Sequence, residues 1–420
     1  MGVWQRSPRS AAVLCAHAGH QNDAWAALPD LRQQDVIGSA YAIRADTVDT
    51  QLGGDAGLVI ARAALAARGV RLVLDFVPNH IAIDHDWTTA YPNWCVRGSV
   101  ADLAREPQAF LAVAGQVLAN GRDPYFPAWP DVVQVDLSAP GLRRALVARL
   151  VALAGRCDGM RVDMAMLLLH RVFAATWAGR CGPLPDAEFW ASAIAALRRA
   201  WPTCQLMAEA YWDTDAELLA LGFDRVYDKR LYDLVMHGDA DGVRVRLARS
   251  ADWQMRQVRF AENHDEARVA TAAAGRTAAT LVALLTLPGV RLWHEGQELG
   301  RRVRTPVTLG RRPHEPDDAV AMRLQRRVRA ILALPVLRDG VWTMLAVQGA
   351  DGLVAWVWRM RGEMVVAVVN LGQHEAHGRV VVDPFVAIED LLDAGATARW
   401  ESDALALCIP AGGAAVLRFR

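Results

Sequence analysis

Four carboxylates in this sequence stand at the ends of short apolar stretches that resemble buried parallel strands. Asp75 lies near the end of VRLVLDFV, Asp163 ends DGMRVD, Glu209 lies near the end of CQLMAEA, and Asp265 comes shortly after QVRFAE. Side chains at the carboxyl ends of parallel strands meet at one rim of a barrel, where active sites are built. A single such carboxylate is equally well explained by solvation or helix capping, but several that converge favour a shared chemical task.

An arginine beside one of these carboxylates strengthens that interpretation. Arg161 and Asp163 are two residues apart on a predicted strand, so their side chains face the same side. The apolar run MAMLLLH follows directly, and charge beside a core segment is costly unless it is paired. We therefore expect the Arg161 guanidinium to pair with Asp163 and keep it ionised.

Paired carboxylates around a cleft suit the cleavage of glycosidic bonds. Cleavage with retention needs a nucleophilic carboxylate and a protonated carboxylic acid about 5–5.5 Å away. A guanidinium favours the ionised nucleophile, and a partly apolar setting keeps the acid protonated. The residue types at these strand ends therefore predict glycosidase chemistry.

The elements that would position these residues alternate between helix and strand. Apolar, strand-like segments that read as buried on both faces follow helical patterns along the first three quarters of the chain. The helical segments are 58–68, 141–155, 191–202 and 277–289, and the strand segments are 70–77, 158–163, 204–210, 222–227, 257–262 and 290–296. This alternation predicts an α/β fold, a (β/α)8 TIM barrel rather than an open doubly wound sheet. Neither GxGxxG nor GxxxxGK[ST] follows a predicted strand, which disfavours nucleotide binding.

Three regions are expected along the chain. Residues 1–335 would form the catalytic barrel, with an irregular excursion at 81–140 between its third and fourth strands. After about residue 335 the segments become short, β-prone and separated by polar turns. Residues 336–420 are therefore predicted to form an antiparallel, β-sandwich-like C-terminal domain.

Four segments resemble the short conserved regions of the α-amylase family, glycoside hydrolase family 13. They are DFVPNH at 75–80, GMRVD at 159–163, MAEA at 207–210 and FAENHD at 260–265. Each alone is a weak signal, but the four occur in the family's order, and the resemblance covers essentially the whole chain. The NHDEAR form at 263–268 and the short excursion are more similar to oligosaccharide-acting or transglycosylating members than to large starch-degrading ones.

The resemblance implies a catalytic role for three carboxylates. Asp163 would be the nucleophile and Glu209 the general acid/base. Asp265 would stabilise the transition state by binding sugar hydroxyls. The implied mechanism is double displacement through a covalent glycosyl-enzyme.

Five further residues are implied to bind the substrate. Arg161 would orient Asp163, while His80 and His264 would hydrogen-bond the sugar at the site of cleavage. Tyr41 resembles the aromatic platform for that sugar, although an ordinary packed tyrosine is the alternative. Asp75 would organise the site rather than take part in the chemistry.

The chain departs from the family's pattern at three places. It begins at GVWQRSP, which resembles the family's second strand, so the first strand and helix are expected to be missing. Met166 and Leu167 stand where the family often has a polar pair that contacts the sugar on the leaving-group side. Ala45 and Asp46 replace an Asp-Tyr pair that usually follows the platform tyrosine.

The resemblance leaves more than one function open. We expect an α-retaining glycoside hydrolase that acts on α-glucosidic oligosaccharides, and the alternative is a trehalose-synthase-like isomerase or glucosyltransferase of the same family. From another class, a catalytically silent barrel could serve as a binding module. The presence of Asp163, Glu209 and Asp265 speaks against that module. A phosphosugar-processing barrel would need a glycine-rich phosphate loop near its last strands, and the sequence has none.

The amino-acid composition limits the classes of binding partner that are expected. Lys+Arg and Asp+Glu are both 46, so nothing points to nucleic acid or an anionic membrane. The segment HEGQE at 294–298 departs from HExxH, so no metal site and no cofactor are expected, and a structural calcium ion is not indicated. Six scattered cysteines, the absence of a signal-peptide pattern and the absence of a run of about 20 apolar residues favour a cytoplasmic protein. The expected partner is an α-glucoside or oligosaccharide, and the sequence leaves the oligomeric state open.

Overall fold

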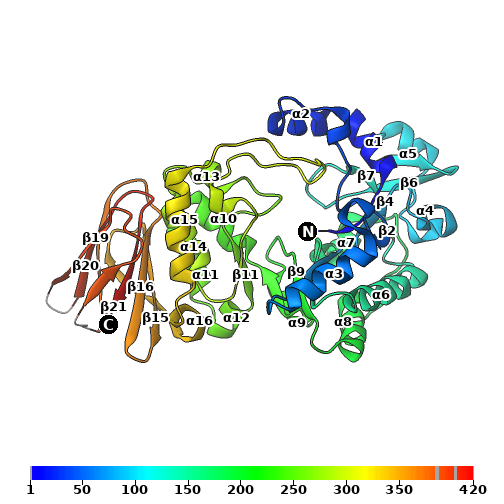
Figure 1. Cartoon of the computed structure of the whole chain (residues 1–420). Helices are drawn as coiled ribbons and strands as arrows, with labels where there is room; N and C mark the ends of the chain where they lie inside the picture. The colour runs from blue at the N-terminus through cyan, green and yellow to red at the C-terminus, as the bar shows by residue number, and fades with distance from the viewer. Residues whose placement is uncertain (1, 384–386, 402–403, 420) are drawn as a thin grey trace. The chain divides into compact units, whose positions relative to one another are not determined.

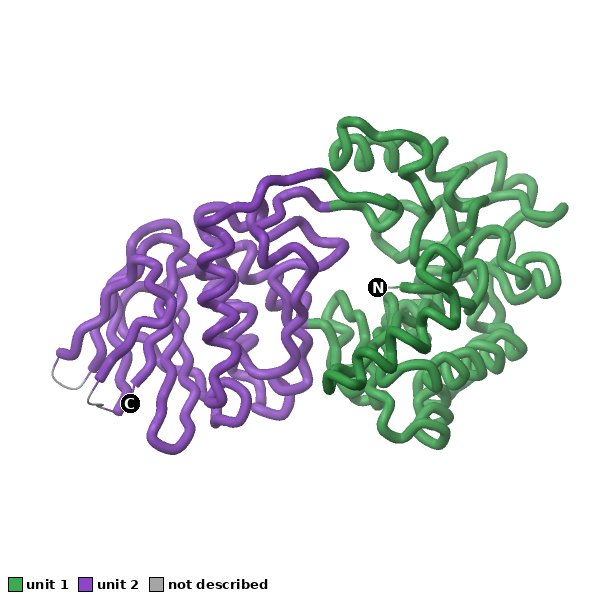
Figure 2. Tube along the Cα trace, in the orientation of Figure 1, with its two compact units in different colours: residues 1–227, 305–313 green, residues 228–304, 314–420 purple. Residues whose placement is uncertain are grey.

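A computed structural model describes residues 2–383, 387–401 and 404–419 of the chain (Figure 1). The chain divides into two compact units (Figure 2). Unit 1 comprises residues 1–227 and 305–313, and unit 2 comprises residues 228–304 and 314–420. This division falls within the predicted barrel, so the limits 1–335 and 336–420 stay a prediction.

Unit 1 contains parallel strands that alternate with helices along the chain. Its parallel strands lie in the order β10, β9, β8, β3, and are β3 (Val73–Phe76), β8 (Gly159–Val162), β9 (Gln205–Ala208) and β10 (Arg225–Tyr227). The helices that precede or separate them along the chain are α3 (Gly54–Ala66), α6 (Pro140–Ala154), α7 (His170–Thr176), α8 (Phe189–Ala200) and α9 (Asp215–Ala220). Each predicted strand and helix of this region is therefore present, within a few residues of its expected limits.

Helix α3, which precedes β3, shows what defines these boundaries in the sequence. Leu58 is buried on α3, while the neighbouring Val59 and Ile60 are exposed to solvent. Gly69 follows the helix at φ +68°, a left-handed conformation that favours glycine, and its N–H donates to Ala66 O. Gly69 therefore lies in the turn that separates α3 from the segment leading to β3.

The excursion between β3 and β8 is more regular than predicted. It forms a four-stranded antiparallel sheet in the order β4, β7, β6, β5, with β4 (His80–Ala82), β5 (Phe110–Val113), β6 (Gln116–Gly121) and β7 (Trp129–Gln134). Short helices α4 (Trp87–Ala90) and α5 (Val100–Arg105) connect its strands. The expectation of an irregular segment at 81–140 is thus corrected.

An antiparallel pair of strands stands at the start of the chain. The strands β1 (Trp4–Arg6) and β2 (Ile43–Val48) pair with each other, and helices α1 (Pro8–Ala16) and α2 (Ala18–Ala27) lie between them in the sequence. The buried Trp4 indole donates a hydrogen bond to the backbone oxygen of Asp75, 2.7 Å away. The first strand therefore fixes the backbone at the end of β3.

Unit 2 begins with helices and continues with two parallel strands. The helices are α10 (Lys229–His237), α11 (Ala240–Leu247), α12 (Ala251–Met255), α13 (Val269–Ala272), α14 (Thr277–Leu285), α15 (Ala319–Leu332) and α16 (Val336–Asp339). The parallel pair is β11 (Gln257–Phe260) and β12 (Val290–Leu292). Helix α14 between them is buried almost all round, which explains its uninterrupted apolar sequence TAATLVALL.

The C-terminal part of unit 2 is a sandwich of two antiparallel sheets, as predicted (Figure 1). The larger sheet has the order β13, β15, β16, β21, β18, with bounds Val341–Leu345, Leu353–Met360, Glu363–Asn370, Ala414–Phe419 and Ile388–Asp390. The smaller sheet has the order β14, β17, β20, β19, with bounds Val347–Gly349, Ala376–Val380, Ala404–Ile409 and Thr397–Glu401. Buried aliphatic side chains from both sheets, such as Val366 and Leu405, form one core between them.

No helix among the described residues combines the length and the apolar character that crossing a membrane requires.

Candidate active site

Four predicted site residues meet at the carboxyl ends of neighbouring strands in unit 1. Asp75 on β3 lies opposite Arg161 on β8, and Arg161 lies opposite Met207 on β9. The backbone pairing continues one residue further, because Asp163 N–H donates to Phe76 O and Glu209 N–H donates to Val162 O. Parallel register thus brings the two predicted catalytic carboxylates to the same level of the sheet.

A single guanidinium joins the carboxylates of this rim. Arg161 Nη1 donates to Asp163 Oδ1 at 2.8 Å, and Nη2 lies 2.8 Å from Glu209 Oε1. Asp75 Oδ2 is 3.7 Å from Arg161 Nη1. The predicted pairing of Arg161 with Asp163 is therefore present, and the same arginine also contacts Glu209 and Asp75.

The arginine and its partners are buried, and this sets their electrostatics. Each of Asp75, Arg161, Asp163 and Glu209 is at most 6% exposed. Burial works against the charged guanidinium, but Glu209, Tyr227 and Asp75 outweigh it, so the pKa of Arg161 lies well above its ordinary value. Arg161 therefore carries its positive charge at neutral pH.

Two tyrosine rings lie near this guanidinium. The Arg161 guanidinium carbon is 5.5 Å from the ring centroid of Tyr41 and 5.7 Å from that of Tyr227. Burial raises the pKa of Tyr227 to about 12, so its hydroxyl keeps its proton. The structure thus places Tyr41 beside the site. Tyr227 is an addition that the sequence interpretation missed, although it ends the predicted strand 222–227.

Glu209 is oriented by two groups that the sequence did not indicate. The backbone N–H of Met164 donates to Glu209 Oε2 at 2.7 Å, and the Tyr211 hydroxyl donates to Glu209 Oε1 at 2.7 Å. Met164 has φ +44°, a left-handed conformation that is uncommon for a residue with a side chain. This turn directs the N–H that follows Asp163 towards the neighbouring strand's carboxylate.

Asn79 follows β3, and His80 is the first residue of β4 in the antiparallel sheet. The ring of His80 packs edge-on against Trp129, with centroids 5.1 Å apart. Burial lowers the pKa of His80 to about 4, so the ring is neutral at pH 7 and offers one donor and one acceptor. Asn79 exchanges hydrogen bonds with Gln134 of β7 and anchors the sheet at this point.

The remaining predicted site residues belong to unit 2. Asp265 follows β11 with a half-exposed side chain, and His264 Nε2 lies 3.0 Å from Asp265 Oδ2. Asn263 Oδ1 accepts hydrogen bonds from the backbone N–H groups of Asp265 and Glu266, which fixes the turn. The sequence's NHDE segment therefore folds as one hydrogen-bonded turn at the end of a parallel strand.

Buried polar contacts of Glu262, the residue just before this turn, hold the turn in place. Glu262 is fully buried, and its two oxygens accept from Arg268 Nη1 and from the N–H of Val269, each at 2.7 Å. His294 Nδ1 lies 3.3 Å from the same carboxylate.

The only lysine of the sequence also lies near this turn. Lys229 Nζ is 2.5 Å from Asp233 Oδ1 and 3.2 Å from Glu266 Oε1. The residue that follows Asp265 thus has its own cationic partner.

Two of the departures from the family's pattern have structural explanations. Met166 and Leu167 are buried in a short 3-10 helix, Ala165–Leu168, so their side chains pack in the core. The regular helix α7 begins only after this segment, at His170. Asp46 forms a two-pronged ion pair with Arg149 of α6, at 2.6 and 2.7 Å, and fastens β2 to the helix layer.

No family model and no curated protein sequence matches the chain.

Solved structures match the chain over nearly its whole length. A noncanonic maltogenic α-amylase, AmyB from Thermotoga neapolitana, has a TM-score of 0.68 and 18% identity, with 91% of this chain and 85% of the amylase covered. An α-amylase from Lactobacillus plantarum has a TM-score of 0.64 and 20% identity, with 91% and 86% covered. A cyclic α-maltosyl-(1→6)-maltose hydrolase from Arthrobacter globiformis has a TM-score of 0.65 and 18% identity, with 90% and 82% covered. The chain therefore has the fold of the α-amylase family, a TIM barrel followed by a C-terminal β domain, which confirms the resemblance indicated by its four sequence segments.

Proposed function

We propose that the protein is a glycosidase that cleaves α-glucosidic oligosaccharides with retention of configuration. The observation that carries this proposal is the buried group of Arg161, Asp163 and Glu209, which adjacent parallel strands bring to one rim. A buried carboxylate that accepts from a guanidinium suits a nucleophile, and a second carboxylate beside it suits an acid/base. The structural neighbours are named for α-glucosidic substrates, which supports the same substrate class.

The first half of the reaction would form a covalent intermediate. An Asp163 oxygen attacks the anomeric carbon, and the bond from that carbon to the leaving oxygen breaks. Glu209 gives its proton to the leaving oxygen as the bond breaks. Arg161 holds the attacking carboxylate in place, and the hydrogen bonds from Met164 N–H and Tyr211 orient Glu209.

The second half would release the sugar. Glu209 takes a proton from an incoming water, whose oxygen attacks the anomeric carbon while the bond to Asp163 breaks. When a sugar hydroxyl takes the place of water, the same step transfers the glycosyl group instead. These steps use carboxylates and an acceptor hydroxyl, so we propose that no cofactor takes part.

Buried polar atoms at the rim support a role in binding. Among the described residues, Asp75 Oδ2 and Arg161 Nε have no hydrogen-bond partner although both are buried. Buried polar groups in folded proteins are normally paired, so such atoms mark places where a ligand or water completes the bonding. We propose that Asp265, His264, His80 and Tyr41 contribute the remaining sugar contacts, in the roles that the resemblance implies.

The test is incubation of the full chain with maltose, sucrose, trehalose and maltooligosaccharides, followed by product analysis. NMR of the first products should show the α-anomer, because two inversions restore the configuration. Asp163→Ala should lower kcat by several orders of magnitude, with an unchanged circular dichroism spectrum.

A matched variant separates this effect from a general loss of charge. Asp186 lies in an exposed loop of unit 1, so Asp186→Asn should keep the activity of the parent chain. If Asp163→Ala retained normal turnover, or if the first product were the β-anomer, the proposed mechanism would be wrong.

We also propose a location in the reducing cytoplasm. All six cysteines are free thiols in the structure, and three of them, Cys95, Cys157 and Cys204, are buried. Unpaired buried thiols are typical of proteins from reducing compartments.

A further inference from the structure

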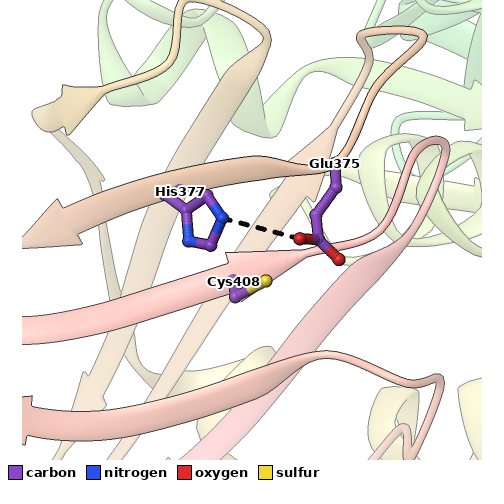
Figure 3. Close-up of side chains that lie close together, drawn as sticks. All are labelled: Glu375, His377 and Cys408. Carbon is purple, nitrogen blue, oxygen red and sulfur yellow. Dashed lines mark ion pairs between the residues drawn. The ribbon is translucent and has the colours of Figure 1, made fainter.

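The outer face of the smaller sheet in the C-terminal sandwich brings three metal-binding side chains together (Figure 3). They are Glu375, His377 and Cys408, whose ligand atoms all lie within 4.8 Å of one another. We propose that these three residues bind a zinc ion, or another divalent cation that prefers sulfur and nitrogen ligands.

Strand register is what places the three residues together. His377 on β17 lies directly opposite Cys408 on β20 in an antiparallel pair. Glu375 comes two residues before His377, so its side chain faces the same side of the sheet. The neighbours Ala376 and Ile409, which pair with each other, are buried against the sandwich core. The alternation of the two strands therefore directs the thiol, the imidazole and the carboxylate outwards.

The chemistry of the donor atoms favours zinc over hard cations. Thiolate sulfur, imidazole nitrogen and carboxylate oxygen are the three ligand types of zinc sites, whereas calcium and magnesium prefer oxygen alone. Three protein ligands leave the fourth tetrahedral position to water. Since His377 and Glu375 are largely exposed, solvent reaches this position.

The spacing is close to what a tetrahedral ion requires. His377 Nε2 lies 3.5 Å from Glu375 Oε1. Zinc–ligand bonds of about 2.0–2.3 Å place tetrahedral ligand atoms about 3.3–3.8 Å apart. All separations between the ligand atoms are within 4.8 Å, so small rotations of the exposed side chains bring the three atoms to the spacing that a tetrahedral ion requires.

Two side chains contact the Cys408 thiol. The Cys408 thiol is hydrogen-bonded to Glu375 on one side and to Thr397 of β19 on the other. Thr397 pairs with Cys408 in the register of β19 and β20. Metal binding would replace the thiol proton, which leaves to solvent, and would tie β17 to β20 through their side chains. The expected consequence is a more stable C-terminal sandwich.

Cobalt(II) is a suitable probe because it occupies zinc sites and reports a thiolate ligand by charge-transfer absorption. Titration of the full, reduced chain should saturate this absorption at one equivalent. Cys408→Ser should abolish the absorption, and His377→Ala and Glu375→Ala should each weaken cobalt binding by about tenfold or more, the size of effect seen when a metal site loses supporting groups. Zinc should displace the cobalt and raise the thermal unfolding midpoint of the parent chain but not of Cys408→Ser.

A control distinguishes a built site from a reactive thiol. Cys181 is a partly exposed cysteine of unit 1 outside this cluster, so Cys181→Ser should bind cobalt like the parent chain. Cobalt absorption that His377→Ala and Glu375→Ala leave unchanged would show binding by a thiol alone and overturn the proposal. A parent chain that shows no thiolate absorption would overturn it as well.

Discussion

Arg161 links two carboxylates to which the proposed chemistry gives different tasks. Its two terminal nitrogens lie 2.8 Å from oxygens of Asp163 and Glu209, and the side chain is 7% exposed. A planar guanidinium can bind two acceptors in fixed directions, whereas an ammonium is a point charge on a flexible stem. The type of cation, and not charge alone, therefore sets the geometry at this rim.

Replacement of this arginine should separate geometry from charge. Arg161→Lys is expected to keep the fold but to lower kcat strongly, because one ammonium cannot hold both carboxylates. Arg161→Met leaves Asp75, Asp163 and Glu209 buried without a cation, which should cost about 3–5 kcal/mol of unfolding free energy at neutral pH. Steady-state kinetics and chemical denaturation measure the two effects.

The control is an exposed arginine in a salt bridge of its own. Arg171 pairs with Glu217 on the surface of unit 1, so Arg171→Lys should change neither kcat nor stability. Equal activity of Arg161→Lys and the parent chain would contradict the role given to the guanidinium.

The buried His80 leads to a prediction about how the stability of the protein depends on pH. The pKa of His80 is about 4 in the folded chain because burial disfavours the charged ring, and about 6.5 in the unfolded chain. The unfolded state therefore takes up the proton first as the pH falls. The stability from the neutral ring is complete above pH 6.5 and declines towards pH 4, by at most about 3 kcal/mol.

NMR of the histidine ring protons checks this directly. The His80 signal, assigned by its loss in His80→Gln, should keep one chemical shift from pH 8 to pH 5. A midpoint for His80 close to 6.5 would show that the ring is more solvated than its packing against Trp129 implies.

At the scale of elements, the turn after β8 matters as much as the strand itself. Met164 takes a left-handed conformation, φ +44°, and this turn presents its N–H to Glu209. A side chain in this conformation costs about 1 kcal/mol because Cβ approaches the following backbone oxygen. This unfavourable conformation occurs at the residue whose N–H orients the Glu209 carboxylate.

Substitution with small residues should reveal the strain of that turn. Met164→Gly is expected to be more stable than Met164→Ala by about 1 kcal/mol, since both lose the same side-chain packing and only alanine keeps a Cβ. The opposite order is expected at Ala195 on α8, where glycine in place of alanine should destabilise by about 1 kcal/mol. Urea unfolding of these variants measures both differences, and the same order at both positions would argue against a left-handed Met164.

The sequence predicted the strand ends well and the hydrogen-bond partners poorly. Asp75, Asp163 and Glu209 follow apolar runs bounded by clear helices, so their common rim could be read from pattern alone. The hydrogen bond from the Met164 N–H could not be predicted, because the type of a residue does not show where its backbone N–H points. Tyr211 could have been found, since it lies two residues after Glu209 on the same side of an extended segment. The sheet within 81–140 was missed because its strands, such as WPDVVQ, mix proline and polar residues with apolar ones.

At the scale of the whole molecule, the chain leaves unit 1, returns to it for one short segment and then continues in unit 2. Residues 305–313 belong to unit 1, although the residues on both sides belong to unit 2. Within unit 1, Ile37 N–H donates to Thr308 O, Gly310 N–H donates to Asp35 O, and Arg311 Nε donates to Asp35 Oδ1 at 2.9 Å. Contacts between residues more than 270 positions apart leave no local pattern in the sequence, so they could not be predicted from it.

Arg311→Ala should loosen this segment. The Arg311 hydrogen bonds, with the N–H of Arg32, lower the pKa of Asp35, so their contribution is present above the ordinary carboxylate pKa and is lost as the pH falls through the lowered value. The variant should therefore have a lower thermal midpoint than the parent chain at pH 7, and the gap should narrow at pH 3. Calorimetry at the two pH values tests this, with Arg338→Ala as an exposed control that pairs only with its neighbour Asp339. A gap of the same size at both pH values would show that the ion pair is not its source.

The single lysine has a chemical consequence for a protein that would work among sugars. The aldehyde form of a reducing sugar condenses with amines, and Lys229 is the only side-chain amine in the sequence. That amine lies between the carboxylates of Asp233 and Glu266, where it is largely covered. Prolonged storage in glucose or maltose should therefore add sugar to side-chain amines at one position at most, so the protein should resist glycation to a degree that a lysine-rich enzyme of the same size would not.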